Sequence, residues 1–372
     1  MPIAQRPDET VATPELHQIL SADGTQLRPL PEALTTDVQL RMYRFMRLNR
    51  LLDERMVKLQ RQGRIGFYGP CTGQEATPVA TAAALQPTDL IFPGLREGVA
   101  MLYRGFSLET FLCQVFGNQK DVLKGRQMPS HYADRSVNVV SWSSCIGPQL
   151  TQAVGAAWAA KLRRSGEICV GFMGDGATSS ADFHTALNFA GVYRTPCVLI
   201  CQNNHWSISV PTRGQTASRT LAEKAVAYGL PYARVDGNDA FAVFDAVSEA
   251  AQRARKGGGA TFLEMLTYRI GAHSTSDDPR VYRDEREVEQ WKKRDPIQRL
   301  FRFLIGKKVW SEDRDEALTV ELDQYIQAEL ESAERRPAPA IETLFEDVYA
   351  TMPWHLREQA ADLAEHKASP AS

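Results

Sequence analysis

Two short polar motifs carry the residues of this chain whose types and spacing fit a chemical site. Gly174-Asp175-Gly176 is followed, after the 26 residues from Ala177 to Gln202, by Asn203-Asn204. This interval is about enough for one helix and one strand, so we expect the two motifs to follow neighbouring parallel strands. The Asp175 carboxylate, the Asn204 amide oxygen and a main-chain carbonyl near Trp206 are the hard oxygen ligands that Mg²⁺ takes. The motifs therefore predict a site for a magnesium-bound diphosphate.

The glycines beside Asp175 support this interpretation. Glycine permits close approach of the backbone to a ligand, and the amides of Gly176 to Ser180 lead into a helix whose positive end favours phosphate. A lone Gly-Asp-Gly is more often an ordinary turn. The succession of strand, Gly-Asp-Gly, helix, strand and Asn-Asn at this spacing is hard to obtain by chance and favours the site.

The segments around the motifs alternate between strand and helix patterns. Apolar runs predict strands at 89–92, 168–173, 197–201, 233–235 and 261–270, and helical periodicity covers 36–62, 76–85, 98–103, 148–162, 181–193 and 240–256. This alternation is typical of an α/β fold with a parallel sheet flanked by helices on both faces. Ligands of such sheets bind beyond the carboxyl ends of the strands, where both motifs and His273 are expected.

Composition divides the chain into three parts. Residues 1–36 are rich in Pro, Thr and Asp and predict an extended N-terminal arm that lies over the surface or on a partner. Residues 37–294 hold the α/β pattern, and residues 295–372 form a C-terminal helical extension, clearest at 318–333 and followed by a polar tail. The small side chains of the helix at 148–162 suit close packing against another helix, in this chain or in a second subunit.

Composition and charge exclude several classes of function. The 372 residues carry a net charge of -2 and a pI of about 6.4, without the basic footprint of a nucleic-acid-binding protein. No apolar segment approaches the roughly 20 residues of a membrane span, and residues 1–9 lack the features of a signal or transit peptide. The six cysteines include no CxxC pair and are expected to be reduced, mostly buried thiols. We therefore expect a cytoplasmic protein that binds neither nucleic acid nor membrane.

Three segments resemble a known family. Residues 174–211, GDGATSSADFHTALNFAGVYRTPCVLICQNNHWSISVP, resemble the thiamine diphosphate motif of the decarboxylase α subunits of 2-oxo acid dehydrogenases. Residues 125–132, GRQMPSHY, and residues 268–278, YRIGAHSTSDD, are most similar to the branched-chain members. The resemblance runs from about Gln60 to the C-terminus and implies the thiamin diphosphate-binding fold.

The resemblance implies which residues hold the cofactor and the metal. Mg²⁺ would be bound by Asp175, Asn204 and the carbonyl of Trp206, and Arg96 would clamp the diphosphate. Ile146 would prop the two cofactor rings into their bent form. The full set of positions that match cofactor contacts comprises Leu95, Arg96, Ser144, Cys145, Ile146, Gly174, Asp175, Gly176, Ala177, Thr178, Asn204, Trp206, Ser207 and His273.

The resemblance also implies a catalytic histidine and a substrate pocket. His273 would face the diphosphate and the reacting carbon, where a neutral imidazole donates a hydrogen bond and a protonated one offsets charge. Substrate-pocket positions of relatives match Phe67, Leu95, Met128, His131 and Ser144. Outside the family, a lone loop histidine or a pair of apolar residues is more often structural.

Three positions depart from the family pattern, and a fourth matches it without a clear role. Leu95 stands where relatives often have Tyr, Gln202 replaces an Arg of some members, and Ala272 replaces a second His. Diphosphate contacts and substrate preference are therefore expected to differ in detail. Ser274 matches a serine phosphorylated in mitochondrial relatives, and its Ser/Thr/Asp surroundings fit ordinary polar turn chemistry equally well.

A second subunit follows from the same resemblance. Activation of thiamine diphosphate needs a carboxylate from another domain, and 372 residues leave no room for that domain. The family implies a β subunit that supplies it in an α2β2 assembly. The implied reaction is oxidative decarboxylation of a branched-chain 2-oxo acid, with transfer of the acyl group to a lipoyl group on a partner acyltransferase.

Three alternatives stay open at this stage. A pyruvate or acetoin dehydrogenase α subunit is the nearest. A nicotinamide-binding Rossmann oxidoreductase shares the α/β pattern, but no GxGxxG opens a helix after a strand with an acidic residue about 20 positions later. A noncatalytic scaffold subunit would account for the extended ends and the small-residue helix.

Overall fold

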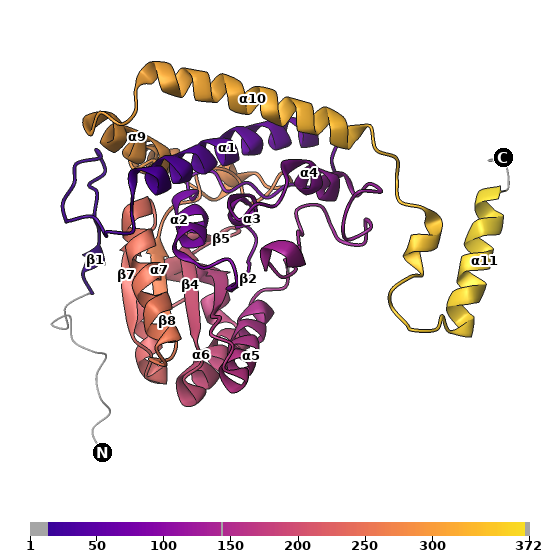
Figure 1. The fold of residues 1–372 in the computed structure, drawn as a ribbon, viewed down its shortest axis with the longest axis horizontal. Coiled ribbons are helices and arrows are strands. Elements are labelled where there is room, and N and C mark those ends of the chain that lie inside the picture. Colours follow the sequence, from indigo (N-terminus) through magenta and orange to yellow (C-terminus); the bar gives the residue numbers. More distant parts are fainter. Residues whose placement is uncertain (1–13, 143, 369–372) are drawn as a thin grey trace.

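A parallel sheet lies at the centre of the computed structural model, which describes residues 14–142 and 144–368 (Figure 1). Within these residues the sheet has six strands in the order β1-β7-β8-β4-β3-β2, each pair parallel. The strands are β1 (Leu16–His17), β2 (Leu90–Phe92), β3 (Cys169–Gly174), β4 (Cys197–Asn203), β7 (Tyr232–Asp236) and β8 (Thr261–Leu266). The predicted α/β fold with a parallel sheet is confirmed.

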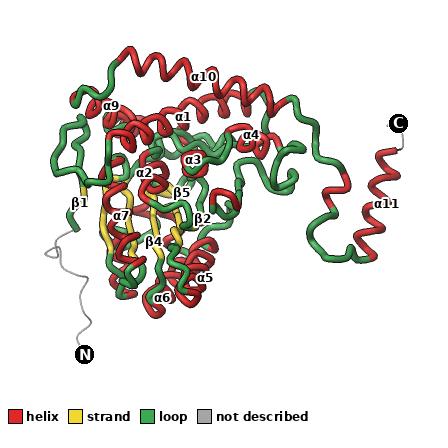
Figure 2. Tube along the Cα trace, viewed as in Figure 1, coloured by secondary structure: helices red, strands yellow, loops and turns green. Residues whose placement is uncertain are grey.

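Helices cover both faces of this sheet, as Figure 2 shows. α5 (Pro148–Arg163) and α6 (Ala181–Tyr193) pack on one face, and α2 (Ala76–Ala84) and α7 (Ala240–Arg255) on the other. Outside α2 and α7 lie α1 (Thr36–Arg61), α3 (Gly98–Tyr103), α4 (Leu108–Phe116), α9 (Pro296–Gly306) and α10 (Glu312–Glu334). α8 (Glu285–Lys292) follows β8, and a small hairpin, β5 (Trp206–Ser207) and β6 (Val210–Pro211), follows β4.

The alternation of side chains along the central strands supplies two apolar cores. Val170 and Phe172 of β3 join the core under α2 and α7. Cys169 and Met173 of the same strand join the core under α5 and α6. Successive strand residues point to opposite faces, so a strand buried on both faces reads as a continuous apolar run. This is why the sequence pattern predicted these strands well.

The N-terminal segment is anchored to the edge of the sheet. Leu16 and His17 pair with β7, and the amides of Ile19 and Leu20 donate to Asp239 Oδ2 at 2.7 and 2.6 Å. Asp239 also caps α7, because its side chain accepts the first free amides of that helix. The described part of the predicted arm is bound to the α/β core, but it is not extended throughout, because an antiparallel bridge between Leu20 and Gln26 closes a turn. Residues 1–13 of that prediction lie outside the described residues.

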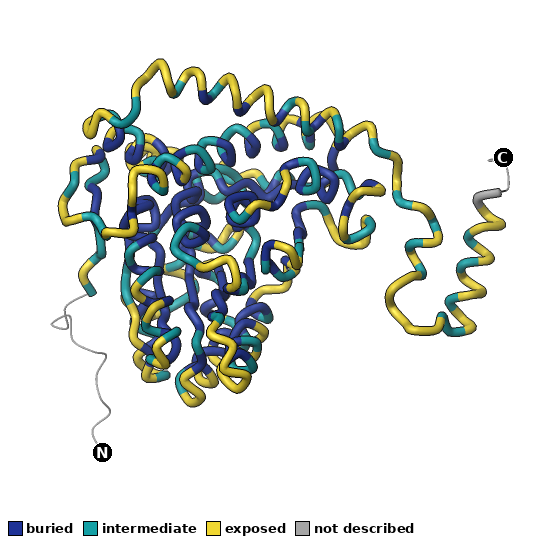
Figure 3. Tube along the Cα trace, in the orientation of Figure 1, coloured by how far each residue is buried: buried dark blue, intermediate teal, exposed yellow. Residues whose placement is uncertain are grey.

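The C-terminal extension is helical, as predicted, but its parts differ in how they pack. Ile297 and Leu300 of α9 and Leu322 and Ile326 of α10 are buried in the same apolar core as α1 and α7. α11 (Trp354–Ala368) forms where the sequence predicted only a polar tail, and it stands away from the body with most of its residues exposed (Figures 1 and 3). α9 and α10 thus continue the core, and α11 extends beyond it.

Three further expectations concern cysteines, strands and membranes. Cys71, Cys113, Cys169, Cys197 and Cys201 are buried free thiols, as expected, and Cys145 is exposed. β8 ends at Leu266, earlier than the predicted residue 270, because its neighbour β4 ends at Asn203 and leaves no strand to pair with. Among the described residues no helix is long and apolar enough to cross a membrane.

Candidate active site

A cavity of about 310 Å³ opens at the carboxyl ends of four adjacent strands. The segment after β2 brings Leu95 and Arg96 to it, and the segment after β3 brings Asp175. Asn204 follows β4, and His273 lies seven residues beyond β8. Ligands of parallel sheets bind at this edge because the loops and helix ends converge there. The fold therefore brings together residues that are almost 180 positions apart in the sequence.

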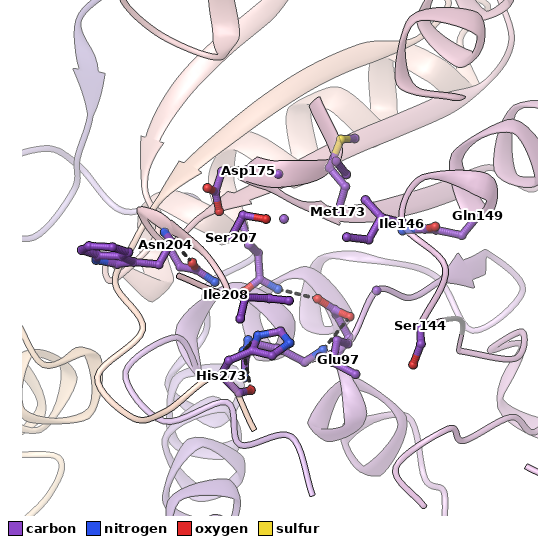
Figure 4. Close-up of a pocket in the computed structure, with 18 of the residues that line it drawn as sticks. Glu97, Ser144, Ile146, Gln149, Met173, Asp175, Asn204, Ser207, Ile208 and His273 are labelled. Atoms are coloured by element: carbon purple, nitrogen blue, oxygen red, sulfur yellow. Dashed lines mark hydrogen bonds between the residues drawn. The ribbon is translucent and has the colours of Figure 1, made fainter. Parts of the chain in front are cut away.

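Most of the predicted site residues line this cavity. Those on its wall are Phe67, Leu95, Arg96, Met128, Ser144, Cys145, Ile146, Gly174, Asp175, Gly176, Ala177, Asn204, Trp206, Ser207 and His273. Figure 4 shows Asp175 and Asn204 on one side of the cavity and Ile146 and Ile208 between them and Ser144.

Two predicted residues lie behind the wall instead. His131 is buried, and its Nε2 forms a hydrogen bond with Ser144 Oγ, so it contacts the wall through that serine. Thr178 is fully buried, donates to the Asp175 carbonyl at 2.8 Å and accepts from Lys224 Nζ at 3.0 Å. Both side chains orient neighbours of the cavity, and neither lines it.

Asp175 is a buried carboxylate with a capacity for a cation. It is 2% exposed, and its Oδ2 accepts from Thr212 Oγ1 at 3.1 Å and from Gln215 Nε2 at 3.0 Å. Burial raises the pKa of this carboxyl group, and among the described residues no Lys, Arg or His forms an ion pair with it. Buried charges in proteins are paired or coordinate metals, so this carboxylate fits a metal ion placed at the cavity.

Neutral oxygens line the same cavity as this carboxylate. Asn204 donates through Nδ2 to Gln74 Oε1 at 2.9 Å, and its Oδ1 accepts from the Trp206 amide at 3.2 Å. The Trp206 carbonyl accepts from Arg269 Nη1 at 3.3 Å. Each of these oxygens has a second lone pair. The described residues hold no cluster of three His, Cys, Asp or Glu suited to a metal, so the donor set is one carboxylate with neutral oxygens, as hard cations such as Mg²⁺ accept.

The close approach of two loops explains the second glycine of the Gly-Asp-Gly motif. A Cβ atom at Gly176 would lie 2.2 Å from Ser207 Oγ and 2.7 Å from Ser207 Cβ. A Cβ at Gly174 would meet no heavy atom within 4 Å. Glycine at 176 therefore allows the loop after β3 to contact the β5 strand that follows Asn204.

Arg96 and His273 form a pair on the opposite wall. Arg96 Nη2 lies 3.3 Å from His273 Nδ1 and donates to the His273 carbonyl at 2.9 Å, while its Nη1 donates to the Pro70 carbonyl. Burial, followed by the charges of Arg96 and Arg269, lowers the pKa of His273 to about 4. His273 is therefore neutral at pH 7. Because arginine only donates, Nδ1 is the acceptor, and the proton resides on Nε2.

Sequence reasoning missed several polar residues of this wall. Glu97 is buried, accepts from Gln202 Nε2 at 2.7 Å and from the Arg96 amide at 3.1 Å, and burial raises its pKa to about 7. Gln74 and Gln149 also line the cavity from buried positions. The adjacency of Glu97 to Arg96 was the one available signal, and nothing in the sequence marked Gln74 or Gln149.

The apolar side of the cavity is open. Met128 is 56% exposed, Ile146 55% and Ile208 48%. Ile208 also has a φ of 53° in the turn between β5 and β6, which is a strained conformation for a β-branched residue. Large exposed apolar side chains that rim a cavity mark a surface for a ligand or a partner.

Known proteins resemble nearly the whole chain. The family model of the dehydrogenase E1 component matches residues 43–342. Human mitochondrial 2-oxoisovalerate dehydrogenase subunit alpha is 40% identical over 353 residues, which cover 94% of this chain and 79% of the relative. Subunit alpha 2 of the enzyme from Arabidopsis thaliana is 41% identical over 327 residues (88% and 69%), and the subunit alpha from Caenorhabditis elegans is 39% identical over 364 residues (97% and 84%). Each of these relatives is named as a mitochondrial protein, so they do not support the expectation that this chain is cytoplasmic. With a match over most of its length to both the family and these relatives, the chain belongs to the dehydrogenase E1 component family.

Proposed function

We infer that this chain acts as the α subunit of a branched-chain 2-oxo acid dehydrogenase, an oxidoreductase. Its relatives at 39 to 41% identity carry the name 2-oxoisovalerate dehydrogenase subunit alpha, and the identity covers 88 to 97% of this chain. One observation on the site supports the same conclusion most directly. The Asp175 carboxylate and the Asn204 amide follow paired parallel strands and line one cavity, as a metal-bound diphosphate requires.

We propose that the cavity binds thiamine diphosphate with Mg²⁺. Asp175, Asn204 and the Trp206 carbonyl would hold the ion, and the Arg96 guanidinium, 7% exposed, would add positive charge for the diphosphate. When bound, the cofactor supplies the electron sink for loss of CO₂ from the 2-oxo acid. The protein supplies the orientation, the metal and the electrostatic environment.

His273 would contribute a hydrogen bond to the reacting centre. Its Nδ1 faces Arg96, so the protonated Nε2 is the nitrogen available to the cavity. The neutral ring can donate this proton to an oxygen of the substrate, and it stays neutral because burial and two arginines oppose its protonation. Exclusion of water from this wall would strengthen the interaction.

The apolar residues would accommodate a branched side chain. Phe67, Leu95 and Met128 lie on the cavity wall with Ile146, and none of them carries a charge. Apolar contacts of this kind favour a branched aliphatic substituent over the methyl group of pyruvate by about 0.8 kcal/mol for each additional buried methylene.

Two partners complete the proposal. A β subunit would cover the open apolar side of the cavity and provide the activating carboxylate, in an α2β2 assembly. A lipoyl-bearing acyltransferase would accept the acyl group. The exposed Met128, Ile146 and Ile208 around the cavity support the first of these partners.

The complex of this chain with its β subunit provides the direct test. We expect release of CO₂ from 4-methyl-2-oxopentanoate with a clearly higher kcat/KM than from pyruvate, and no release by this chain alone. Preference for pyruvate would instead indicate a pyruvate dehydrogenase.

Cofactor binding tests the site separately. Calorimetry of the complex with thiamine diphosphate and Mg²⁺ should show binding that the double variant Asp175→Ala, Asn204→Ala abolishes. Asp182→Ala is the matched control. Asp182 lies on α6, between the two motifs in the sequence, but does not line the cavity, so this variant should bind the cofactor normally. Normal binding by the double variant would refute the assignment of the metal ligands and favour a noncatalytic scaffold.

A further inference from the structure

Asp53 on α1 is a buried carboxyl group behind the cavity, and it accepts hydrogen bonds from a loop that contributes two residues to the cavity wall. Asp53 is 1% exposed and does not line the cavity. The loop after α1, residues 66–75, brings Phe67 and Gln74 to the cavity wall. It has no regular secondary structure, so its side-chain contacts must set its position.

Three groups of this loop donate hydrogen bonds to the Asp53 side chain. Its Oδ1 accepts from Tyr68 OH at 2.9 Å, and its Oδ2 accepts from the Cys71 amide and from Thr72 Oγ1, both at 2.8 Å. Asn49, one turn earlier on α1, adds a longer contact of 3.4 Å. Burial raises the pKa of Asp53 to about 7, and its oxygens accept these hydrogen bonds whether or not the group is protonated. A buried donor left without its acceptor costs about 1–3 kcal/mol.

A second contact from α1 holds the end of the same loop. Arg50 pairs with Glu75 at 2.5 Å and with Asp295 at 2.9 Å, and Glu75 accepts from the Gly73 amide at 3.0 Å. Arg50 and Asp53 are three residues apart on the helix and lie on neighbouring positions of its surface. α1 therefore binds the loop at two points.

The loop in turn contacts both halves of the cavity. Its Pro70 carbonyl accepts from Arg96 Nη1, and Gln74 Oε1 accepts from Asn204 Nδ2 at 2.9 Å. Tyr68 exchanges two hydrogen bonds with Thr275, which lies two residues after His273. The contacts that begin at Asp53 therefore reach Arg96, the segment of His273, and the side-chain amide of Asn204.

We propose that Asp53 is a positioning residue of the cofactor site, which acts through the 66–75 loop on Arg96, His273 and Asn204. The proposal rests on the proposed function, because it assigns these three residues to cofactor binding. Mutation of residues that orient metal ligands from behind typically lowers metal affinity about 10- to 100-fold. Asp53 itself touches neither cofactor nor substrate.

The test compares Asp53→Ala with Asp53→Asn in the complex with the β subunit. The alanine variant should raise the Kd for thiamine diphosphate with Mg²⁺ at least about tenfold. The asparagine variant keeps an acceptor oxygen for Cys71 and Thr72 and should stay within about threefold of the wild type. Hydrogen exchange of the 66–75 peptide, measured without cofactor, should accelerate in the alanine variant and much less in the asparagine variant.

Asp239→Ala is the matched control. Asp239 is equally buried and also accepts from four donors, but these belong to the N-terminal segment and the start of α7. Its removal should lower stability and leave the Kd unchanged. If an alanine variant fails to fold, Tyr68→Phe combined with Thr72→Val decides the question, since it removes two donors to Asp53 and keeps the packing.

The outcomes separate the two proposals. A wild-type complex that does not bind thiamine diphosphate with Mg²⁺ refutes the proposed function. If the wild-type complex binds the cofactor, and Asp53→Ala or the Tyr68→Phe, Thr72→Val variant binds it with a Kd within about threefold of the wild-type value, the role of Asp53 is refuted. An Asp239→Ala variant that loses as much affinity as Asp53→Ala also refutes it, because the effect would then be general destabilisation.

Discussion

Arg96 and His273 bind each other twice, through the imidazole Nδ1 at 3.3 Å and the main-chain carbonyl at 2.9 Å, and both contacts come from the same guanidinium nitrogen. The arginine thereby sets the tautomer of the histidine as well as its position. A cation beside an imidazole also opposes a second positive charge, so the pair behaves as one fixed cation with a neutral donor.

This pair predicts how His273 titrates. The ring should stay neutral down to about pH 4, and Arg96→Ala should raise its pKa toward the ordinary value of 6.5. Nitrogen NMR of labelled histidines would detect both the tautomer and the titration. His205, whose pKa is lowered to about 4 by burial and by Arg294 and Arg234, should not respond to Arg96→Ala. An unchanged His273 pKa in that variant would contradict the coupling.

Glu97 predicts a pH dependence of stability. Its pKa is raised from 4.5 to about 7 by burial, so between these two pH values the folded chain holds a proton that the unfolded chain has lost. The stabilisation from this proton is complete below pH 4.5 and is lost as the pH rises to 7, by an amount on the order of 3 kcal/mol. Glu97→Gln removes the titration. The melting temperature of Glu97→Gln minus that of the wild type should therefore be larger at pH 8 than at pH 5. An equal difference at both pH values would contradict the predicted titration of Glu97.

Gly176 predicts a steric effect with a specific remedy. Gly176→Ala places a methyl group against Ser207 and should lower the melting temperature, with a free-energy cost of about 1–3 kcal/mol. Gly174→Ala, which meets no neighbour, serves as the control and should melt close to the wild type. Ser207→Gly added to Gly176→Ala should restore most of the loss. Failure of this second change would show that close contact is not the reason for the glycine.

Gln74 predicts an effect on metal affinity from outside the ligand set. Gln74→Leu leaves Asn204 Nδ2 without its acceptor, so the amide is free to rotate away from the ion. The Mg²⁺ concentration needed for half-maximal cofactor binding should rise about 10- to 100-fold, as for other partners of metal ligands. Gln74→Glu keeps an acceptor oxygen and should bind Mg²⁺ at least as well as the wild type. Equal Mg²⁺ requirements for the leucine variant and the wild type would exclude the role.

Sequence alone predicted the features of this site that depend on local pattern. Asp175 and Asn204 were recognised because each follows an apolar strand, and strands buried on both faces are visible as apolar runs. The family resemblance added Arg96 and Ile146, which have no local pattern of their own, and it gave a role to His273, which the strand pattern alone predicts at this edge of the sheet. All five residues line the cavity.

Contacts between segments that are distant in the chain could not be predicted from the sequence. Nothing near Asp175 indicates that Thr212 and Gln215 bind its carboxylate, and nothing near Asn204 indicates Gln74, 130 positions earlier. Glu97 was missed because a charged residue in a sequence is normally expected at the surface. The resemblance matches Thr178 to a cofactor contact and His131 to a substrate-pocket position, but position in a motif does not tell which side of the backbone faces the cavity, and both side chains lie behind its wall. These contacts depend on tertiary packing, which periodicity does not encode.

The exposure of Ile146 and Met128 on the rim of the cavity links two equilibria. If the β subunit covers these side chains and also contacts the bound cofactor, each binding event favours the other to the same degree, because the coupling between association and cofactor binding is reciprocal. Dilution of the enzyme would then release cofactor, and cofactor starvation would release subunits. The pool of intact complex in a cell would therefore follow the supply of the vitamin from which the cofactor is made.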